Sequence, residues 1–146
     1  MVEVAAESCR DARVLLTSRD VVYARFLSER LAREGMHVQL SGPTGVGPTT
    51  DLDPSEIDVV IVETHGLGEA DWAMVELVRE RAPLIEVIAI SAGPLLDAAV
   101  EALRTGVFSI LAYPVTDDQL VRDVSSACAR KRRGEVRLRA TEGRTT

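Results

Sequence analysis

The stretch Ile57-Asp-Val-Val-Ile-Val-Glu-Thr-His-Gly-Leu67 decides the fold, because it predicts a buried strand followed directly by polar side chains. Val59 to Val62 is an unbroken β-branched run, which is typical of a central parallel strand buried on both faces. Glu63 and His65 follow at its carboxyl end, where sites form in open α/β sheets. Glu63 is therefore a candidate functional carboxylate, although the position also suits a glutamate that only solvates a loop.

Strand-like and helix-like segments alternate on both sides of this stretch. Strands are predicted at 12–17, 36–40, 86–91 and 107–112, and helices at 20–34, 69–81, 95–105 and from 117 towards 133 or beyond. Asp20 is a suitable N-cap for the first helix, in which Val22 and Phe26 belong to a stripe at helical spacing. This alternation predicts an α/β fold, namely a doubly wound, flavodoxin-like sheet of five parallel strands in the order 2-1-3-4-5.

The segment 41–56 departs from this alternation. A helix is expected between the second and third strands, but the segment is rich in glycine and proline. Both residues break helices. We therefore expect a loop with at most one helical turn, so that the second helix is poorly formed.

Length and composition favour a single cytoplasmic domain. The chain has 146 residues, of which 46% are hydrophobic and 27% charged, as in soluble globular proteins. We find no apolar run long enough to span a membrane and no secretory signal. The two cysteines, Cys9 and Cys128, form no disulfide or metal framework, which favours a reducing compartment.

Charge is distributed unevenly along the chain. Residues 130–146 contain seven basic and two acidic residues, including Lys131, the only lysine, whereas residues 1–129 carry a net charge of −11. We expect a flexible lead-in at 1–11, a domain at 12–130 and a basic tail or linker at 131–146. Nucleic-acid binding is disfavoured, because the body is acidic and no aromatic residues interleave the basic tail.

Three stretches resemble the receiver domain of bacterial two-component response regulators. Asp58-Val-Val-Ile-Val-Glu63 is similar to the strand that ends in the phospho-accepting aspartate. Val87-Ile-Ala-Ile-Ser91-Ala92 and the segment 98–108 resemble the fourth strand and helix, and Leu111-Ala-Tyr-Pro114-Val115 resembles the turn after the fifth strand. The resemblance spans about residues 12–130, and it implies a cis peptide bond before Pro114.

The chemistry that the resemblance implies does not carry over. The family's two Mg²⁺-binding acids are replaced by Ser18 and Arg19, its nucleophile by Glu63 and its lysine by Tyr113; only the hydroxyl of Ser91 matches. His65 stands where the family supplies a carbonyl ligand. Phosphoryl transfer needs cations to offset charge on the transferring oxygens. We therefore expect a degenerate pseudo-receiver without a catalytic residue, metal site or cofactor, in which Mg²⁺ binding is lost.

The pocket and its surroundings allow several interpretations. Arg19 either points into solvent or pairs with Glu63, with Ser18 or Ser91 as a further donor; Asp20 completes the pocket. The resemblance implies an interaction surface on the fourth helix, fifth strand and fifth helix, which contains Arg104, Ser109, Ile110, Asp118 and Arg122. Ile110 replaces the family's switch aromatic, so the aromatic toggle is absent.

The resemblance favours a phosphorylation-independent, non-enzymatic protein-interaction module in two-component signalling. Its partner is expected to be a signalling protein, a histidine kinase, an output domain or a second copy in a homodimer, and not a membrane. One alternative is a small-ligand-sensing domain that uses the emptied acidic pocket. A third interpretation is a receiver that is still phosphorylated on Glu63.

Overall fold

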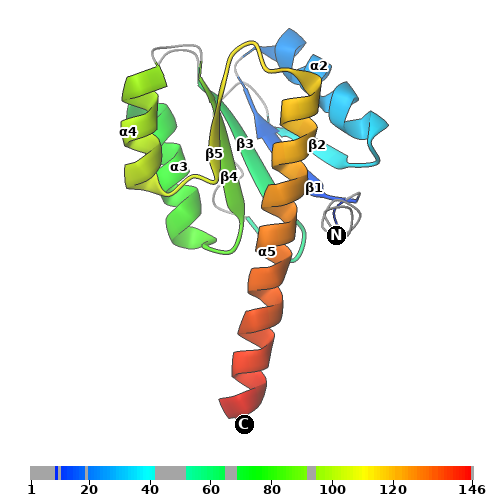
Figure 1. Ribbon diagram of the computed structural model, residues 1–146, viewed down its shortest axis with the longest axis vertical. Coiled ribbons are helices and arrows are strands. Elements are labelled where there is room, and N and C mark those ends of the chain that lie inside the picture. The colour runs from blue at the N-terminus through cyan, green and yellow to red at the C-terminus, as the bar shows by residue number, and fades with distance from the viewer. Residues whose placement is uncertain are drawn as a thin grey trace.

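The computed structural model describes residues 9, 11–18, 20–41, 52–64, 69–91 and 95–145. Its parallel sheet is built from β1 (Arg13–Thr17), β2 (His37–Ser41), β3 (Val59–Thr64), β4 (Glu86–Ser91) and β5 (Ser109–Ala112). The strand order is β2-β1-β3-β4-β5, which confirms the predicted topology (Figure 1).

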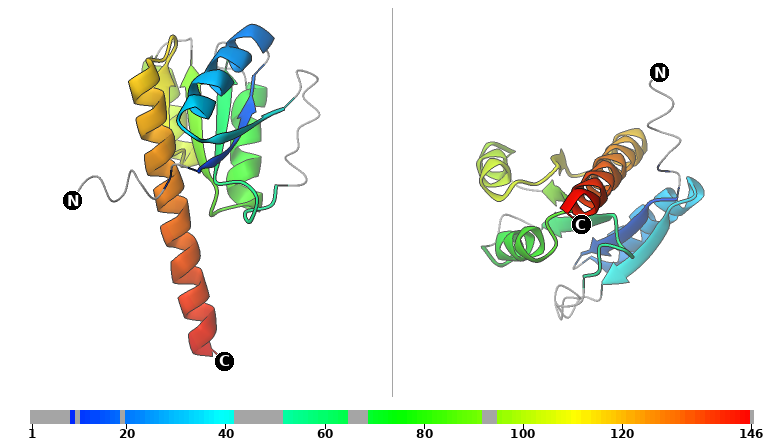
Figure 2. Two further views of the ribbon diagram at one scale, coloured as in Figure 1. Left: turned by 90° about the vertical axis from the view of Figure 1, so that its right-hand side faces the viewer. Right: turned by 90° about the horizontal axis from the view of Figure 1, so that it is seen from below.

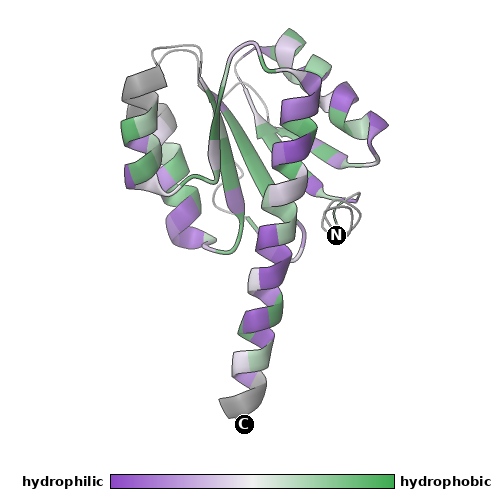
Figure 3. Ribbon diagram, in the orientation of Figure 1, coloured by the Kyte–Doolittle hydropathy of each residue, from purple (hydrophilic) through white to green (hydrophobic). Residues whose placement is uncertain are grey.

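Helices cover both faces of the sheet. One face packs against α2 (Val21–Arg33) and α5 (Asp117–Thr145), and the other against α3 (Glu69–Arg81) and α4 (Leu95–Thr105) (Figure 2). Successive strand residues point to opposite faces, so Leu16 and Ile61 join the first core while Leu15 and Val60 join the second. The central strands β3 and β4 accordingly consist mainly of hydrophobic residues (Figure 3).

The ends of several elements follow the local sequence signals. The Asp20 carboxylate accepts a hydrogen bond from the Tyr23 backbone N–H at 3.0 Å, which confirms it as the N-cap of α2. Gly35 and Gly106 have positive φ angles of 87° and 76°, as expected for residues that follow a helix. Thr116 accepts a hydrogen bond from the Gln119 backbone N–H and caps α5 in the same way.

Two expectations for the first half of the chain need comment. The residues 42–51, most of the expected loop, lie outside the described residues, and the described part at 52–58 contains a turn but no helix. The stripe expected on α2 was wrong in part, because Val22 is 79% exposed and Phe26 48% exposed. The buried face of α2 is formed instead by Ala24, Leu27 and Leu31.

Helix α5 continues beyond Arg133, an extension that the sequence left open, and it crosses the domain boundary expected after Arg130. It runs without a break to Thr145 and projects beyond the body of the domain (Figures 1 and 2). Lys131, which we assigned to the basic tail, is only 1% exposed. The folded body therefore includes at least the first residues of that segment. Among the described helices, none is long and apolar enough to cross a membrane.

Candidate functional site

Glu63 lies at the carboxyl end of β3, as the sequence predicts. It is only 4% exposed, because β1 and β4 flank its strand on both sides. The Ser18 hydroxyl donates a 2.7 Å hydrogen bond to Glu63 Oε2. Ser18 is one of the two serines expected to donate to this carboxylate, and its contact is observed. A neutral hydroxyl therefore lies beside Glu63, where the resemblance would imply a metal-binding acid.

The turn from β1 into α2 holds Ser18 in place. The Asp20 backbone N–H donates to Ser18 Oγ at 3.0 Å, while the Asp20 carboxylate caps α2. The carboxylate of Asp20 is therefore engaged in a local capping role next to the pocket. The same turn orients Tyr23, whose hydroxyl accepts a hydrogen bond from the Val115 backbone N–H at 3.4 Å. Burial raises the pKa of the Tyr23 phenol.

Ser91 ends β4, and Tyr113 directly follows β5, at the same edge of the sheet as Glu63. Ser91 is 2% exposed, and its carbonyl accepts a hydrogen bond from the Tyr113 backbone N–H at 2.9 Å. The Tyr113 ring is 42% exposed and makes an edge-to-face contact with Tyr23, with ring centroids 4.7 Å apart. The peptide bond between Tyr113 and Pro114 is cis, as expected.

Two predicted pocket residues, Arg19 and His65, lie outside the described residues. The predicted approach of the Arg19 guanidinium to Glu63 therefore stays a prediction. Within the described part of the chain, no three His, Cys, Asp or Glu side chains converge as metal ligands would. The described donor set of one carboxylate and a hydroxyl is a poor fit for Mg²⁺, which prefers several oxygen ligands in octahedral geometry.

The expected interaction surface is assembled from the predicted elements. Asp118 and Arg122 are exposed on α5, and Ser109 and Ile110 are half-buried on β5, where Ile110 packs against the core. Arg104 on α4 is exposed and pairs with Glu76 and Glu101. Val100 and Leu103 were not predicted as part of this surface, although they are 58% and 87% exposed.

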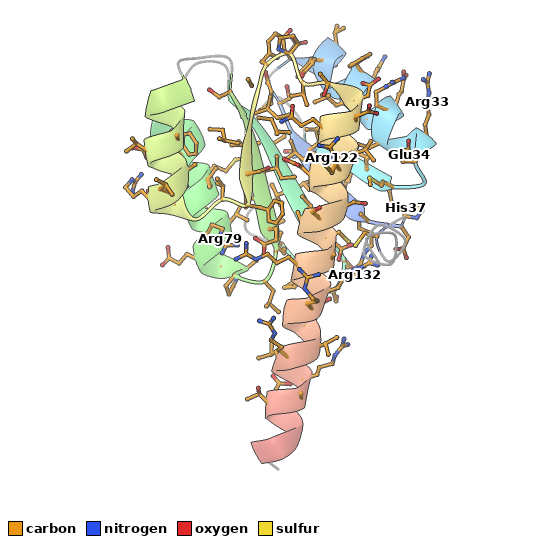
Figure 4. All side chains as sticks on the ribbon, viewed as in Figure 1. Arg33, Glu34, His37, Arg79, Arg122 and Arg132 are labelled. Carbon is orange, nitrogen blue, oxygen red and sulfur yellow. The ribbon has the colours of Figure 1, made fainter. Side chains whose placement is uncertain are left out.

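A second charged cluster, which the sequence analysis missed, lies at the opposite end of β3. Asp58 precedes the strand and is fully buried, and three cationic side chains contact its carboxylate. Lys131 Nζ lies 3.0 Å from Oδ1, Arg132 Nη2 lies 3.1 Å from Oδ2, and Arg13 donates from its backbone N–H at 2.9 Å and from its guanidinium. Figure 4 places Arg132 where α5 leaves the body.

The electrostatics of this cluster favour the charged form of Asp58. Burial opposes ionisation, but the hydrogen bonds from Arg13, Arg132 and Lys131 prevail and hold the pKa of the Asp58 carboxyl well below its usual range. Lys131 also pairs with Glu135 at 3.1 Å and donates to the Pro54 carbonyl. Lys131 lies at the amino end of β3, whereas Glu63 lies at the carboxyl end. Lys131 therefore does not take the place of the lysine that receiver domains have beside the phospho-accepting residue.

Comparison with solved structures confirms the receiver fold. The chain is similar to a response regulator receiver domain from Methanospirillum hungatei JF-1, with a TM-score of 0.72 and 15% identity over 85% of this chain and 98% of that chain. A signal receiver domain of an HD domain-containing protein from Pseudomonas fluorescens Pf-5 gives a TM-score of 0.74 and 18% identity over 88% and 94%.

A similar match is an adenylate cyclase structure from Rhodopirellula baltica, with a TM-score of 0.77 and 19% identity over 90% of this chain and 98% of that chain. No protein-family model matches the chain. No curated protein matches it in sequence either. The likeness at these identities establishes the receiver-type architecture, and function has to be argued from the residues of the site.

Proposed function

We propose that this chain is a phosphorylation-independent, receiver-like protein-interaction module of two-component signal transduction. The observation that carries the proposal is the 2.7 Å hydrogen bond from Ser18 to Glu63 in a fold of receiver type. A hydroxyl adds no negative charge to attract Mg²⁺, and glutamate places its carboxylate one methylene beyond that of aspartate. The module is proposed to lack enzymatic activity.

The test is exposure to acetyl phosphate or beryllofluoride in the presence of Mg²⁺. We expect no mass increase by intact-mass spectrometry and no metal-dependent change in the fluorescence of Trp72, the only tryptophan. A matched variant that combines Arg19→Asp with Glu63→Asp returns carboxylates to the pocket and should begin to bind Mg²⁺. A stable adduct on Glu63 of the unmodified chain would overturn the proposal.

The interaction surface is proposed to be the face formed by α4, β5 and the start of α5. Leu103 and Val100 supply exposed apolar area, and Arg104 lies beside them. Exposed apolar side chains with a polar rim are typical of protein interfaces. The partner is proposed to be a bacterial signalling protein, histidine kinase or output domain, or a second copy of the chain.

Leu103→Asp should abolish capture of that partner from a lysate of the source cells while the melting temperature stays unchanged, because the side chain is 87% exposed. Val22→Asp on α2 is the matched control, since Val22 is also highly exposed but lies on the other side of the sheet. If both variants lost partner capture to the same extent, this surface would be excluded as the interaction site.

A cytoplasmic location is part of the proposal. Cys9 and Cys128 are both buried and do not form a disulfide with each other, which suits a reducing compartment. The small-ligand alternative rests on the emptied acidic pocket and on the segment rich in glycine and proline at 41–56, and a ligand-dependent rise in melting temperature would favour it.

A further inference from the structure

The projecting half of α5 has a basic face with no partner in the described part of the chain. The last fully buried residue of the helix is Lys131, and residues 136–142 are all exposed. Arg130 pairs with Glu86, and Arg132 pairs with Asp11 and Asp58. Arg133 and Arg137 differ from these two arginines, because no described carboxylate contacts their guanidinium groups.

These arginines border a groove with an apolar floor. The groove has a volume of about 400 Å³ and is lined by Ala129, Arg132, Arg133, Val136 and Arg137. Ala129 and Val136 lie two helical turns apart on the same side of the helix, and Val136 is 59% exposed. The acidic Glu135 is turned away from the groove, since its carboxylate reaches back to Lys131.

The projecting segment of α5, which follows Lys131, has little helical stability of its own. An isolated helix of this length is marginal in water. Arg133 and Arg137 stand four residues apart as like charges, which further disfavours the helix. A partner that neutralises this pair and covers Val136 would stabilise the helix directly.

We propose that this groove docks an acidic amphipathic helix of another protein. Charge complementarity favours an acidic occupant, because Arg133 and Arg137 flank an apolar floor and contact no carboxylate of the described residues. An apolar ridge bordered by Glu or Asp fits that pattern. The floor spans two turns of α5, so the docked segment needs two to three turns. The site is separate from the α4–β5–α5 face and from the Glu63 pocket.

Other occupants fit the groove less well. Nucleic acid would use the arginines but not the apolar floor, and no aromatic residue is present between Ala129 and Glu142 to stack on bases. A membrane surface needs a broad apolar face, whereas Val136 and Leu138 point to opposite sides of the helix. A second copy docked through the same face would bring like charges together.

The test uses a labelled, designed peptide whose Leu and Ala positions form one helical stripe flanked by Glu. We expect the full chain to bind it in fluorescence anisotropy, and Arg133→Glu with Arg137→Glu to weaken binding by about tenfold or more. Val136→Ser should weaken it without changing net charge. Arg25→Glu with Arg33→Glu on α2 is the control of equal charge change and should leave the affinity unchanged.

Three results would overturn the proposal. The first is equal binding of a peptide with the same composition and a scrambled stripe, since attraction would then depend on charge alone. The second is tighter binding to a DNA duplex or to phosphatidylserine vesicles than to the peptide. The third is self-association of the chain in sedimentation that Arg133→Glu with Arg137→Glu abolishes, because the occupant would then be a second copy.

Discussion

Replacing Asp58 by asparagine removes one negative charge from a buried point where three cations meet. Lys131 is the most affected, because its ammonium is fully buried. Among the described residues it would keep Glu135, whose side chain is 25% exposed, as its one charged partner. Removing one partner of a buried ion pair costs about 3–5 kcal/mol. Asparagine keeps one accepting oxygen, so we expect a loss near the lower limit, about 3 kcal/mol in the free energy of unfolding.

Glu86 provides a matched control at the same edge of the sheet. It begins β4, the neighbour of β3, and its side chain is 8% exposed. Its contacts are weaker, with Arg130 Nε at 3.1 Å and Arg79 Nη1 at 3.5 Å. Burial outweighs both arginines and raises the pKa of the Glu86 carboxyl. We therefore expect Glu86→Gln to change the free energy of unfolding by less than about 1 kcal/mol.

The two carboxylates should also differ in how they respond to pH. The folded-state pKa of Asp58 is lowered, so its contribution is present above the unfolded pKa of about 3.9 and is lost as pH falls through the folded pKa. The folded-state pKa of Glu86 is raised, so its charge costs stability above the unfolded pKa of about 4.3, and acid relieves that cost.

Urea unfolding followed by circular dichroism measures both effects on the wild type, Asp58→Asn and Glu86→Gln. At neutral pH we expect only the Asp58 variant to lose several kcal/mol, and its deficit should shrink as pH falls below about 4. If Asp58→Asn costs no more than Glu86→Gln at neutral pH, the three cations do not stabilise the fold through Asp58, and the argument is wrong.

Two further substitutions test the contacts at either end of β3. Ser18→Ala removes the donor to Glu63 and the acceptor for the Asp20 backbone N–H, and we expect a loss of about 1–2 kcal/mol in thermal unfolding; Ser18→Thr, which keeps the hydroxyl, should recover most of it. Lys131→Met keeps the side-chain volume and leaves Asp58 two arginines, so it should cost less than Asp58→Asn. Combining Lys131→Met with Asp58→Asn should destabilise less than the sum of the single changes in urea unfolding.

The fold was predictable because the strands and helices carry strong periodic signals. The β-branched run at 59–62 predicts a strand buried on both faces, and β3 is central in the sheet. The inward face of α2 was harder to predict. Its apolar residues surround much of the helix, so spacing alone did not distinguish the exposed Val22 and Phe26 from the buried Leu27.

The pocket was predictable as far as backbone position determines it. The carboxyl ends of β1, β3, β4 and β5 meet at one edge of a parallel sheet, so Ser18, Glu63, Ser91 and Tyr113 had to come near one another. Which side chains touch depends on rotamers and on the turn after β1, which spacing does not specify. Ser18 was expected only as one of two possible hydrogen-bond donors to Glu63, the other being Ser91.

The Asp58–Lys131 pair was missed because Lys131 was interpreted by composition and not by helical position. It lies seven residues after Val124 and three after Cys128, both fully buried, and therefore on the inward side of α5. A lysine on an inward face requires a buried acceptor. Asp58, an acidic residue directly before the buried strand, was a suitable candidate for that acceptor. A basic run therefore does not mark the end of a domain where one of its members continues the buried stripe of the preceding helix.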